Sequence, residues 1–280
     1  MSCPHEEVEP SGAAMAAADE DDAHDHFAKF FECWLTQQER DLQSLRAAAD
    51  GKTGGPDDEA RLRALIDRVL GHYEYYYRAK AASARRDVTP MFAPTWTSST
   101  ENLFLWVGGW RPTMAFHLLY SKSGLQLESR LADQNESPPT ADLAGLTCDQ
   151  LERIDRLHRR TVRLEKQISE QEAQAQETVA DAQMVELSHA MAASGDAMGG
   201  ADEEMERAME GKRERMNEVL DRADELRLET LKAVVDILKP AQAVHFLIAA
   251  AELHLKVHEF GKSKDAAAAP TTGRETAASS

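Results

Sequence analysis

The stretch ADELRLETLKAVVDILKPAQAVHFLIAAAELHLKVHEFG, residues 223–261, decides the fold. On both sides of Pro240, apolar residues recur every three or four positions, which is the period of an amphipathic helix. Proline suits the first turn of a helix and disrupts a helix interior, so Pro240 predicts that a final helix opens or kinks there. That helix is predicted to end at Gly261. Its apolar stripe consists of Val244, Leu247, Ile248, Ala251 and Leu255.

Two long helices precede this final helix. A heptad-like rhythm of apolar residues begins after Thr147 and weakens after Gln171, and a second rhythm runs from Met205 to Val234. Because the linker between them is short, the two helices are expected to pack antiparallel. A helix of ~35 residues would be ~50 Å long, enough to project beyond a compact body and offer a surface for self-association or for a partner.

The N-terminal part predicts two more amphipathic helices. The first begins at about Asp25, and the loop DGKTGGP at residues 50–56 separates it from the second. The apolar residues of the first helix are Phe27, Phe30, Phe31, Trp34, Leu35, Leu42 and Leu45. Those of the second are Leu62, Leu65, Ile66, Val69, Tyr73, Tyr76 and Tyr77.

The following segment is predicted to be less regular. Pro90 and Pro94 break regular structure in residues 87–96. Ser98 and Glu101 have the spacing of a capping box, which predicts a short helix over residues 102–107 that stops at Gly108-Gly109. Pro112 suits the first turn of the next helix.

These patterns predict an all-α fold, a helical bundle with a long antiparallel helix pair. No sustained period-two alternation and no Asn-Gly or Asp-Gly hairpin appears in the sequence. Residues 25–261 are expected to form one helical domain. Residues 1–24 and 262–280 are low in large apolar residues and are expected to be disordered.

Composition excludes several classes of protein. The formal net charge of −17 disfavours nonspecific binding to nucleic acid and to anionic lipid. The densest basic stretch, residues 153–163, is interleaved with acids and fits a solvated helix face. Three cysteines without paired spacing fit a reducing compartment. Neither a signal peptide nor an apolar run of ~18 residues is present, so no membrane association is expected.

No motif indicates catalysis, and no catalytic residue or metal site is predicted. Gly108-Gly109 follows no strand and precedes no GKS or GKT, and the Gly-x-Ser-x-Gly nucleophile elbow is absent. Trp96, Trp106 and Trp110 lie in an apolar stretch that fits the core, with the wall of an apolar ligand pocket as the alternative.

Histidines of the final helix are candidate ligands of haem. His254 and His258 are four residues apart, so their rings share one face, and both continue the apolar stripe. His245 points roughly 100° away from the stripe. Two interpretations stay open: the pair belongs to an interfacial core, or an imidazole beside an apolar wall ligates haem, with His245 or a partner chain as second ligand.

Three motifs carry a resemblance to a known family: HYEYYYRAK at 72–80, NLFLWVGGWRP at 102–112 and LKPAQAVHFLIAAAELHLKVHEFG at 238–261. Together with FFECWLTQQERDL at 30–42, they resemble the plant Delay of Germination domain, which TGA-type bZIP transcription factors also carry. The resemblance covers about residues 25–261. No basic region or leucine heptads precede it, so the stand-alone branch is the expected one.

The resemblance implies a plant regulator of seed dormancy and abscisic-acid signalling, without enzymatic activity, located in nucleus and cytoplasm. Such proteins bind type 2C protein phosphatases, self-associate and are credited with haem binding. The phosphatase segment of the family corresponds to residues 30–42, where Phe30, Phe31, Trp34 and Leu35 become candidate partner-contact residues. The alternative is that these aromatics fill the domain's own core.

A second function stays open. The same domain in TGA-type factors serves transcription through partner binding and has been linked to an acyl-chain ligand. The chain would then be a nuclear interaction module that works with a DNA-binding partner. Direct DNA contact is not expected, because no basic region is present.

Overall fold

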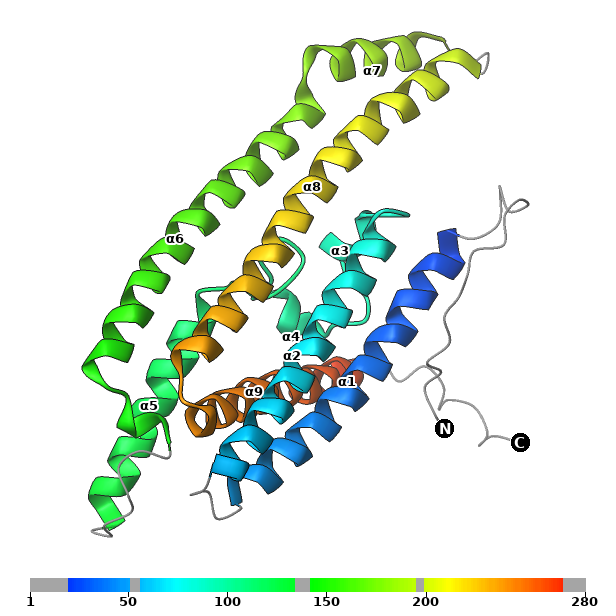
Figure 1. Ribbon diagram of the computed structural model, residues 1–280. Helices are drawn as coiled ribbons and strands as arrows, with labels where there is room; N and C mark the ends of the chain where they lie inside the picture. The colour runs from blue at the N-terminus through cyan, green and yellow to red at the C-terminus, as the bar shows by residue number, and fades with distance from the viewer. Residues whose placement is uncertain (1–19, 51–55, 134–141, 195–198, 269–280) are drawn as a thin grey trace, which may run out of the picture.

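The computed structural model describes residues 20–50, 56–133, 142–194 and 199–268, and regular structure in these ranges is helical (Figure 1). The prediction of an all-α fold is confirmed. Within the described ranges the single β feature is an isolated bridge between Trp106 and Gly109. None of the helices in these ranges combines the length and apolarity needed to cross a bilayer.

A compact body forms around the last helix, α9. Figure 1 shows α1 and α2 side by side, with α9 packed against both and α5 beside it. The short helices α3 and α4 lie in the connection from α2 to α5. The bounds are Glu20–Asp50 for α1, Pro56–Ala84 for α2, Thr89–Phe92 for α3, Ser99–Asn102 for α4, Met114–Asp133 for α5 and Pro240–Ala268 for α9.

The predicted long antiparallel pair is confirmed as α6 and α8. Ion pairs join Arg153 to Asp236 and Arg160 to Glu229, so positions advance along α6 as they retreat along α8. The pair extends past the body, and α7 lies at its tip (Figure 1). The bounds are Leu143–Gly145 for the turn η1, Cys148–Glu177 for α6, Thr178–Ala180 for η2, Ala182–Ser194 for α7 and Gly199–Ile237 for α8.

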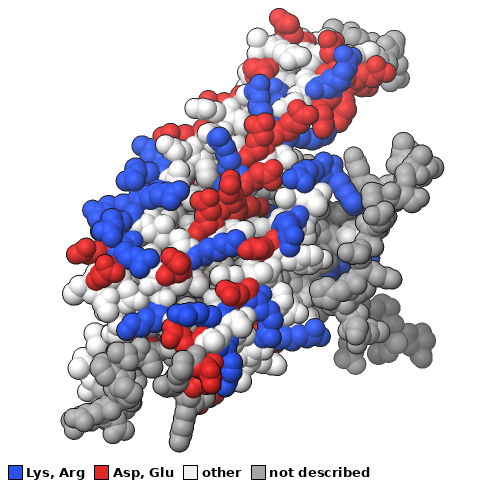
Figure 2. All heavy atoms as spheres, viewed as in Figure 1, with Lys and Arg blue, Asp and Glu red and all other residues white. Residues whose placement is uncertain are grey.

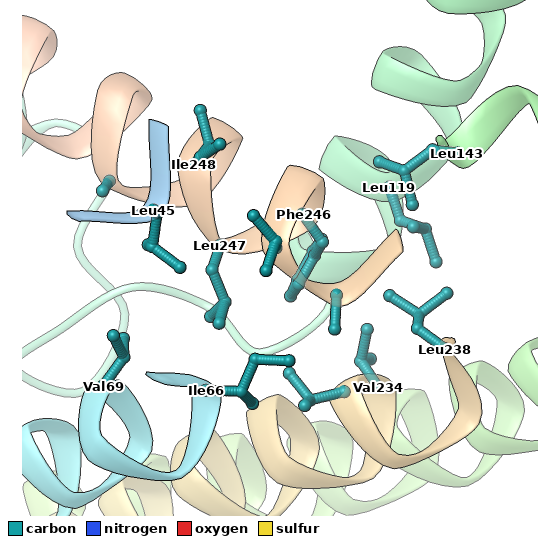
Figure 3. Close-up of a cluster of buried hydrophobic side chains, with 14 of the residues drawn as sticks. Leu45, Ile66, Val69, Leu119, Leu143, Val234, Leu238, Phe246, Leu247 and Ile248 are labelled. Carbon is teal, nitrogen blue, oxygen red and sulfur yellow. The ribbon is translucent and has the colours of Figure 1, made fainter. Parts of the chain in front are cut away.

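The core has two parts. One lies where α1, α2, α5 and α9 meet the end of α8 (Figure 3), and the other lies between α1, α2, α8 and the segment before α5. Each fully buried large apolar side chain contributes about 1.5–3 kcal/mol to folding. The first part includes Leu45, Ile66, Phe116, Leu119, Phe246 and Leu247. The second includes Phe27, Phe31, Trp34, Trp96, Trp106 and Leu220.

Two predicted helix ends are corrected. α9 continues past Gly261 to Ala268, because Gly261 serves a close contact rather than a helix end. A Cβ at Gly261 would lie 2.0 Å from Oγ of Ser98, so only glycine lets α9 approach α4 this closely. At the other end, α1 begins at Glu20 instead of Asp25. The remaining residues of the predicted disordered ends, 1–19 and 269–280, lie outside the described residues.

The predicted helix over residues 102–107 is wrong, although its capping box is correct. Ser98 accepts from the amide of Glu101, and the Glu101 carboxylate accepts from the amide of Ser98. The helix ends at Asn102, and the chain then forms a tight turn in which Val107 has φ 45° and Gly108 has φ 63°. Side chains of α2 and α8 hold this turn through hydrogen bonds to its carbonyls, and the sequence around the turn does not reveal these contacts.

Candidate functional site

A cavity of about 220 Å³ lies between α1, α2, α5, α8, α9 and the segment 94–112. Its wall is mostly aromatic and aliphatic, with a small number of polar side chains, which is the usual character of a small-molecule site. Aromatic lining residues are Phe31, Trp34, Tyr73, Tyr76, Tyr77, Trp96, Trp110 and Phe246. Polar lining residues include Gln38, Lys80, Glu101, Arg227, Thr230 and His254.

Helical spacing builds the aromatic wall. Tyr73, Tyr76 and Tyr77 repeat at steps of three and four, so they share the face of α2 that meets α1. The Trp34 ring centroid lies 5.1 Å from that of Tyr73 and 5.0 Å from that of Tyr76. Burial raises the pKa of Tyr76 and of Tyr77. These phenols therefore stay neutral at physiological pH.

The roof of the cavity is the turn over residues 106–110, which Arg227 holds. Nε of Arg227 donates to the carbonyl of Trp110 at 2.7 Å, and the guanidinium also donates to the carbonyls of Trp106 and Val107. It further pairs with the carboxylate of Asp224. Four acceptors thus converge on one buried cation, which keeps the left-handed turn in place.

Lys80 supports the same turn from α2. Its Nζ donates to the carbonyl of Gly108 at 2.7 Å and to Asp224 at 3.0 Å. Burial lowers the pKa of Lys80 to about 8, although the nearby Asp224 carboxylate opposes that shift. Sequence reasoning missed Lys80, Asp224 and Arg227. Their one signal was charge within otherwise apolar faces of α2 and α8, which rarely occurs without a partner.

Glu101 joins α4 to α9 and is only 1% exposed. Its carboxylate accepts from Nδ1 of His258 at 2.9 Å and from the hydroxyl and amide of Ser98. Burial alone would raise the pKa of Glu101, but these hydrogen bonds outweigh it and lower the pKa. Ser99 and Asp265 form a second contact between the same helices.

The structure brings His254 and His258 together and leaves His245 apart. His254 lines the cavity, and its Nδ1 donates to Oε1 of Gln38 at 2.6 Å. Burial lowers the pKa of His254 to about 4, so the ring is neutral. His245 lies nine residues earlier on α9, roughly 13 Å along the axis and on the opposite side. Its charged neighbours are Asp142 and Lys122, and burial lowers its pKa.

His254 and His258 have contacts that a bound haem would have to replace. Nδ1 of His254 is bound to Gln38, and its Nε2 lies 4.0 Å from the Glu101 carboxylate. The ring of His258 is bound to the same carboxylate. The cavity is also smaller than the ~300–1,000 Å³ typical of sites that bury drug-sized ligands. A porphyrin on these rings would require the contacts of Glu101 to break, and His245 lies too far away to share an iron with His254.

The four candidate partner-contact residues divide into two pairs. Phe31 and Trp34 are buried in the core, so the alternative that they fill the domain's interior describes their place. Phe30 and Leu35 are half-buried. The Phe30 ring lies 5.8 Å from that of Tyr75, and Tyr75 is 56% exposed. Phe30 and Tyr75 together form what we call the α1–α2 aromatic edge.

The tryptophans combine both interpretations made from sequence. Trp96 and Trp106 are buried in the core, and Trp96 and Trp110 line the cavity. Nε1 of Trp106 donates to Ser169 of α6 at 2.8 Å, which ties the roof turn to the long helix pair. The tryptophans therefore connect the cavity with both parts of the fold.

The basic stretch on α6 is a solvated face. Ion pairs join Arg156 to Glu152 and Arg159 to Asp155, each four residues apart. Figure 2 shows Lys and Arg side chains interspersed with Asp and Glu over the face that α6 and α8 present. Such exposed pairs contribute about 0–1 kcal/mol each, and the mixed charge gives no extended basic surface on this face.

Comparison with known proteins gives consistent matches. A family model described as seed dormancy control, DOG1, matches residues 41–121, which contain Tyr73, Lys80 and the roof turn. The chain is 33% identical to Protein DOG1-like 1 of Arabidopsis thaliana over 252 residues, covering 83% of this chain and 87% of that protein. Protein ZW2 of the same plant is 30% identical over 239 residues, covering 84% and 96%. The TGACG-sequence-specific DNA-binding protein TGA-1A of Nicotiana tabacum is 34% identical over 100 residues, covering 36% and 27%.

Proposed function

Because this chain belongs to the DOG1 family of seed dormancy control, we propose that it regulates abscisic-acid signalling by binding a type 2C protein phosphatase, without catalysis of its own. Similarity across most of this chain and most of Protein DOG1-like 1 is the observation that carries the proposal. The coarser statement, a plant regulatory protein of DOG1 type, follows from family membership itself.

The α1–α2 aromatic edge is the contact surface that we propose for the phosphatase. Exposed aromatic side chains anchor many protein interfaces, because they bury a large area and lose little conformational entropy. The Phe30 ring stacks on the Tyr76 ring with 6.2 Å between the ring centroids, so Phe30 is already ordered before a partner arrives. Leu35 lies on the same helix, little more than one turn after Phe30.

Binding of the purified chain to a panel of plant type 2C phosphatases, measured by calorimetry, tests the proposal. Phe30→Ala and Tyr75→Ala should each weaken binding at least tenfold. Phe260→Ala is the matched control, because Phe260 on α9 has the same 56% exposure as Tyr75. Binding to no phosphatase would reject the function, whereas wild-type affinity in both edge variants would reject only the surface.

Self-association and location belong to the same proposal. Leu151 and Val162 on α6 are 41% and 47% exposed, which supports the outer side of the long helix pair as a contact between copies. Light scattering of the wild type against a Leu151→Lys, Val162→Lys variant tests this.

A tagged chain in plant cells should be found in nucleus and cytoplasm, and exclusion from the nucleus would contradict the location.

Haem binding remains a prediction of the resemblance. Titration of the purified protein with hemin should give a sharpened Soret band if haem binds. An unchanged spectrum in the His254→Ala, His258→Ala double variant would reject those residues as ligands, and the His245→Ala variant tests the remaining candidate. The contacts of Glu101 argue against the pair in the folded arrangement.

The second candidate function is a transcription-associated interaction module. Its support is the partial similarity to TGA-type proteins, including Transcription factor TGAL10 of Oryza sativa subsp. japonica at 33% identity over 100 residues. A mobility-shift assay with the purified chain separates the two functions. A shift of DNA at physiological salt would favour this candidate, and no shift is expected for the phosphatase regulator.

A further inference from the structure

Thr230 lines the cavity and carries a buried hydroxyl without a hydrogen-bond partner among the described residues. The residue lies on α8 and is 2% exposed, and its Oγ1 has no hydrogen-bond partner among the described residues. A buried threonine on a helix commonly bonds back to a carbonyl one turn earlier, and Thr230 does not. Buried polar atoms without partners are rare in folded proteins, so this one needs an explanation.

The two buried cations of the wall already have hydrogen-bond partners. Arg227 and Lys80 donate hydrogen bonds to carbonyls of the roof turn, and Lys80 also donates to Asp224. The wall has three cationic side chains, Lys80, Arg111 and Arg227. Lys80 and Arg227 pair with Asp224, and Arg111 lies 4.0 Å from Glu165. With the Glu101 carboxylate these make three acidic groups for three cations, and His254 is neutral. A charged ligand would therefore bring an uncompensated charge into a buried site, which is costly. A neutral ligand with one polar group avoids that cost.

Cavity size sets the rest of the ligand. The volume of about 220 Å³ exceeds the ~150 Å³ of an engineered apolar cavity that binds benzene. One substituted ring therefore fits. Leu253 lines the cavity and is also 45% exposed, so the cavity reaches the surface beside α9.

We propose that this cavity binds a small neutral ligand made of one apolar ring that bears a hydroxyl group, with the ligand hydroxyl bonded to Oγ1 of Thr230. The aromatic wall contacts the ring, and Thr230 selects the hydroxyl. The site requires no haem.

The test uses a matched pair of probes on the full chain. p-Cresol and p-xylene have nearly the same shape, and one hydroxyl replaces one methyl group. Calorimetric titration should show p-cresol binding about tenfold more tightly, since a tenfold ratio corresponds to about 1.4 kcal/mol, the range of one hydrogen bond. In Thr230→Val the preference should vanish while the affinity for p-xylene stays unchanged.

Two further variants make the outcome decisive. Thr36→Val is the matched control, because Thr36 is exposed on α1 and bonds to a backbone carbonyl. It should keep the preference for p-cresol. Ala250→Phe fills the cavity from α9 and should abolish binding of both probes. The proposal is overturned if neither probe binds the wild type, or if Thr230→Val keeps the preference for p-cresol.

Discussion

Arg227→Met should destabilise the protein more than any exposed charge substitution. The Arg227 side chain is 4% exposed, and its guanidinium is shared by three carbonyls of the roof turn and by Asp224. Methionine keeps much of the side-chain volume but leaves those acceptors without their donor. Removing one partner of a buried ion pair costs ~3–5 kcal/mol. Since domains have free energies of unfolding of ~5–15 kcal/mol, the variant should still fold but unfold at much lower urea concentration.

Urea unfolding followed by circular dichroism at 222 nm measures this loss. Arg213→Met is the control, because Arg213 lies on the same helix and makes two ion pairs with a side chain that is 39% exposed. Exposed pairs contribute ~0–1 kcal/mol, so the control should barely shift the midpoint. A loss below ~1 kcal/mol in Arg227→Met, equal to the control, would refute the role of Arg227 in holding the turn.

Three further predictions follow from the same contacts. Gly108→Ala should cost at least ~1–2 kcal/mol in urea unfolding, because φ is +63° and the new Cβ would meet the Met91 carbonyl at 2.6 Å, whereas Gly71→Ala has open space and should be neutral or stabilising. Stability should fall as pH drops from 6.5 towards 4, because the unfolded chain protonates His254 and the folded chain, with a pKa of about 4, does not. The linkage is roughly 3 kcal/mol, and a His254→Gln variant should show a flatter pH profile; an unchanged profile would contradict it. Trp34→Ala should lose ~3–5 kcal/mol by cavity formation, and a variant with wild-type stability would show that Trp34 is not core.

Long periodic elements were predictable because their signals are local. The stripe after Pro240, the start after Thr147 and the short linker were enough to predict the final helix and the antiparallel pair. The roof turn was not predictable in the same way. Its conformation depends on Arg227, more than a hundred residues later, and no pattern near Gly108 reveals that contact. Gly261 was misassigned for a related reason, since its role is set by Ser98 on another element.

The candidate site was predictable in its apolar part and not in its polar part. Periodicity assigned the tyrosines of α2 and the face of His254 correctly, because a core face and a cavity wall share the same spacing. Thr230 gave no signal, because a threonine within a helical stripe is unremarkable until its surroundings are known. Glu101 was identified as a cap, yet its second role as partner of His258 needs a helix 157 residues away in sequence.

The partner surface and the cavity are two faces of the same helices, which couples the two proposals. Phe31 lines the cavity while the adjacent Phe30 belongs to the α1–α2 aromatic edge, and Tyr76 and Tyr75 are divided in the same way. A ligand that packs against Phe31 and Tyr76 contacts the same helical turns that present Phe30 and Tyr75. Any change in phosphatase affinity that the ligand causes must appear equally in ligand affinity when the phosphatase is bound. Titrating p-cresol into the free chain and into the phosphatase complex measures this coupling; we expect tighter binding in the complex, and equal affinities would show that the two faces act independently.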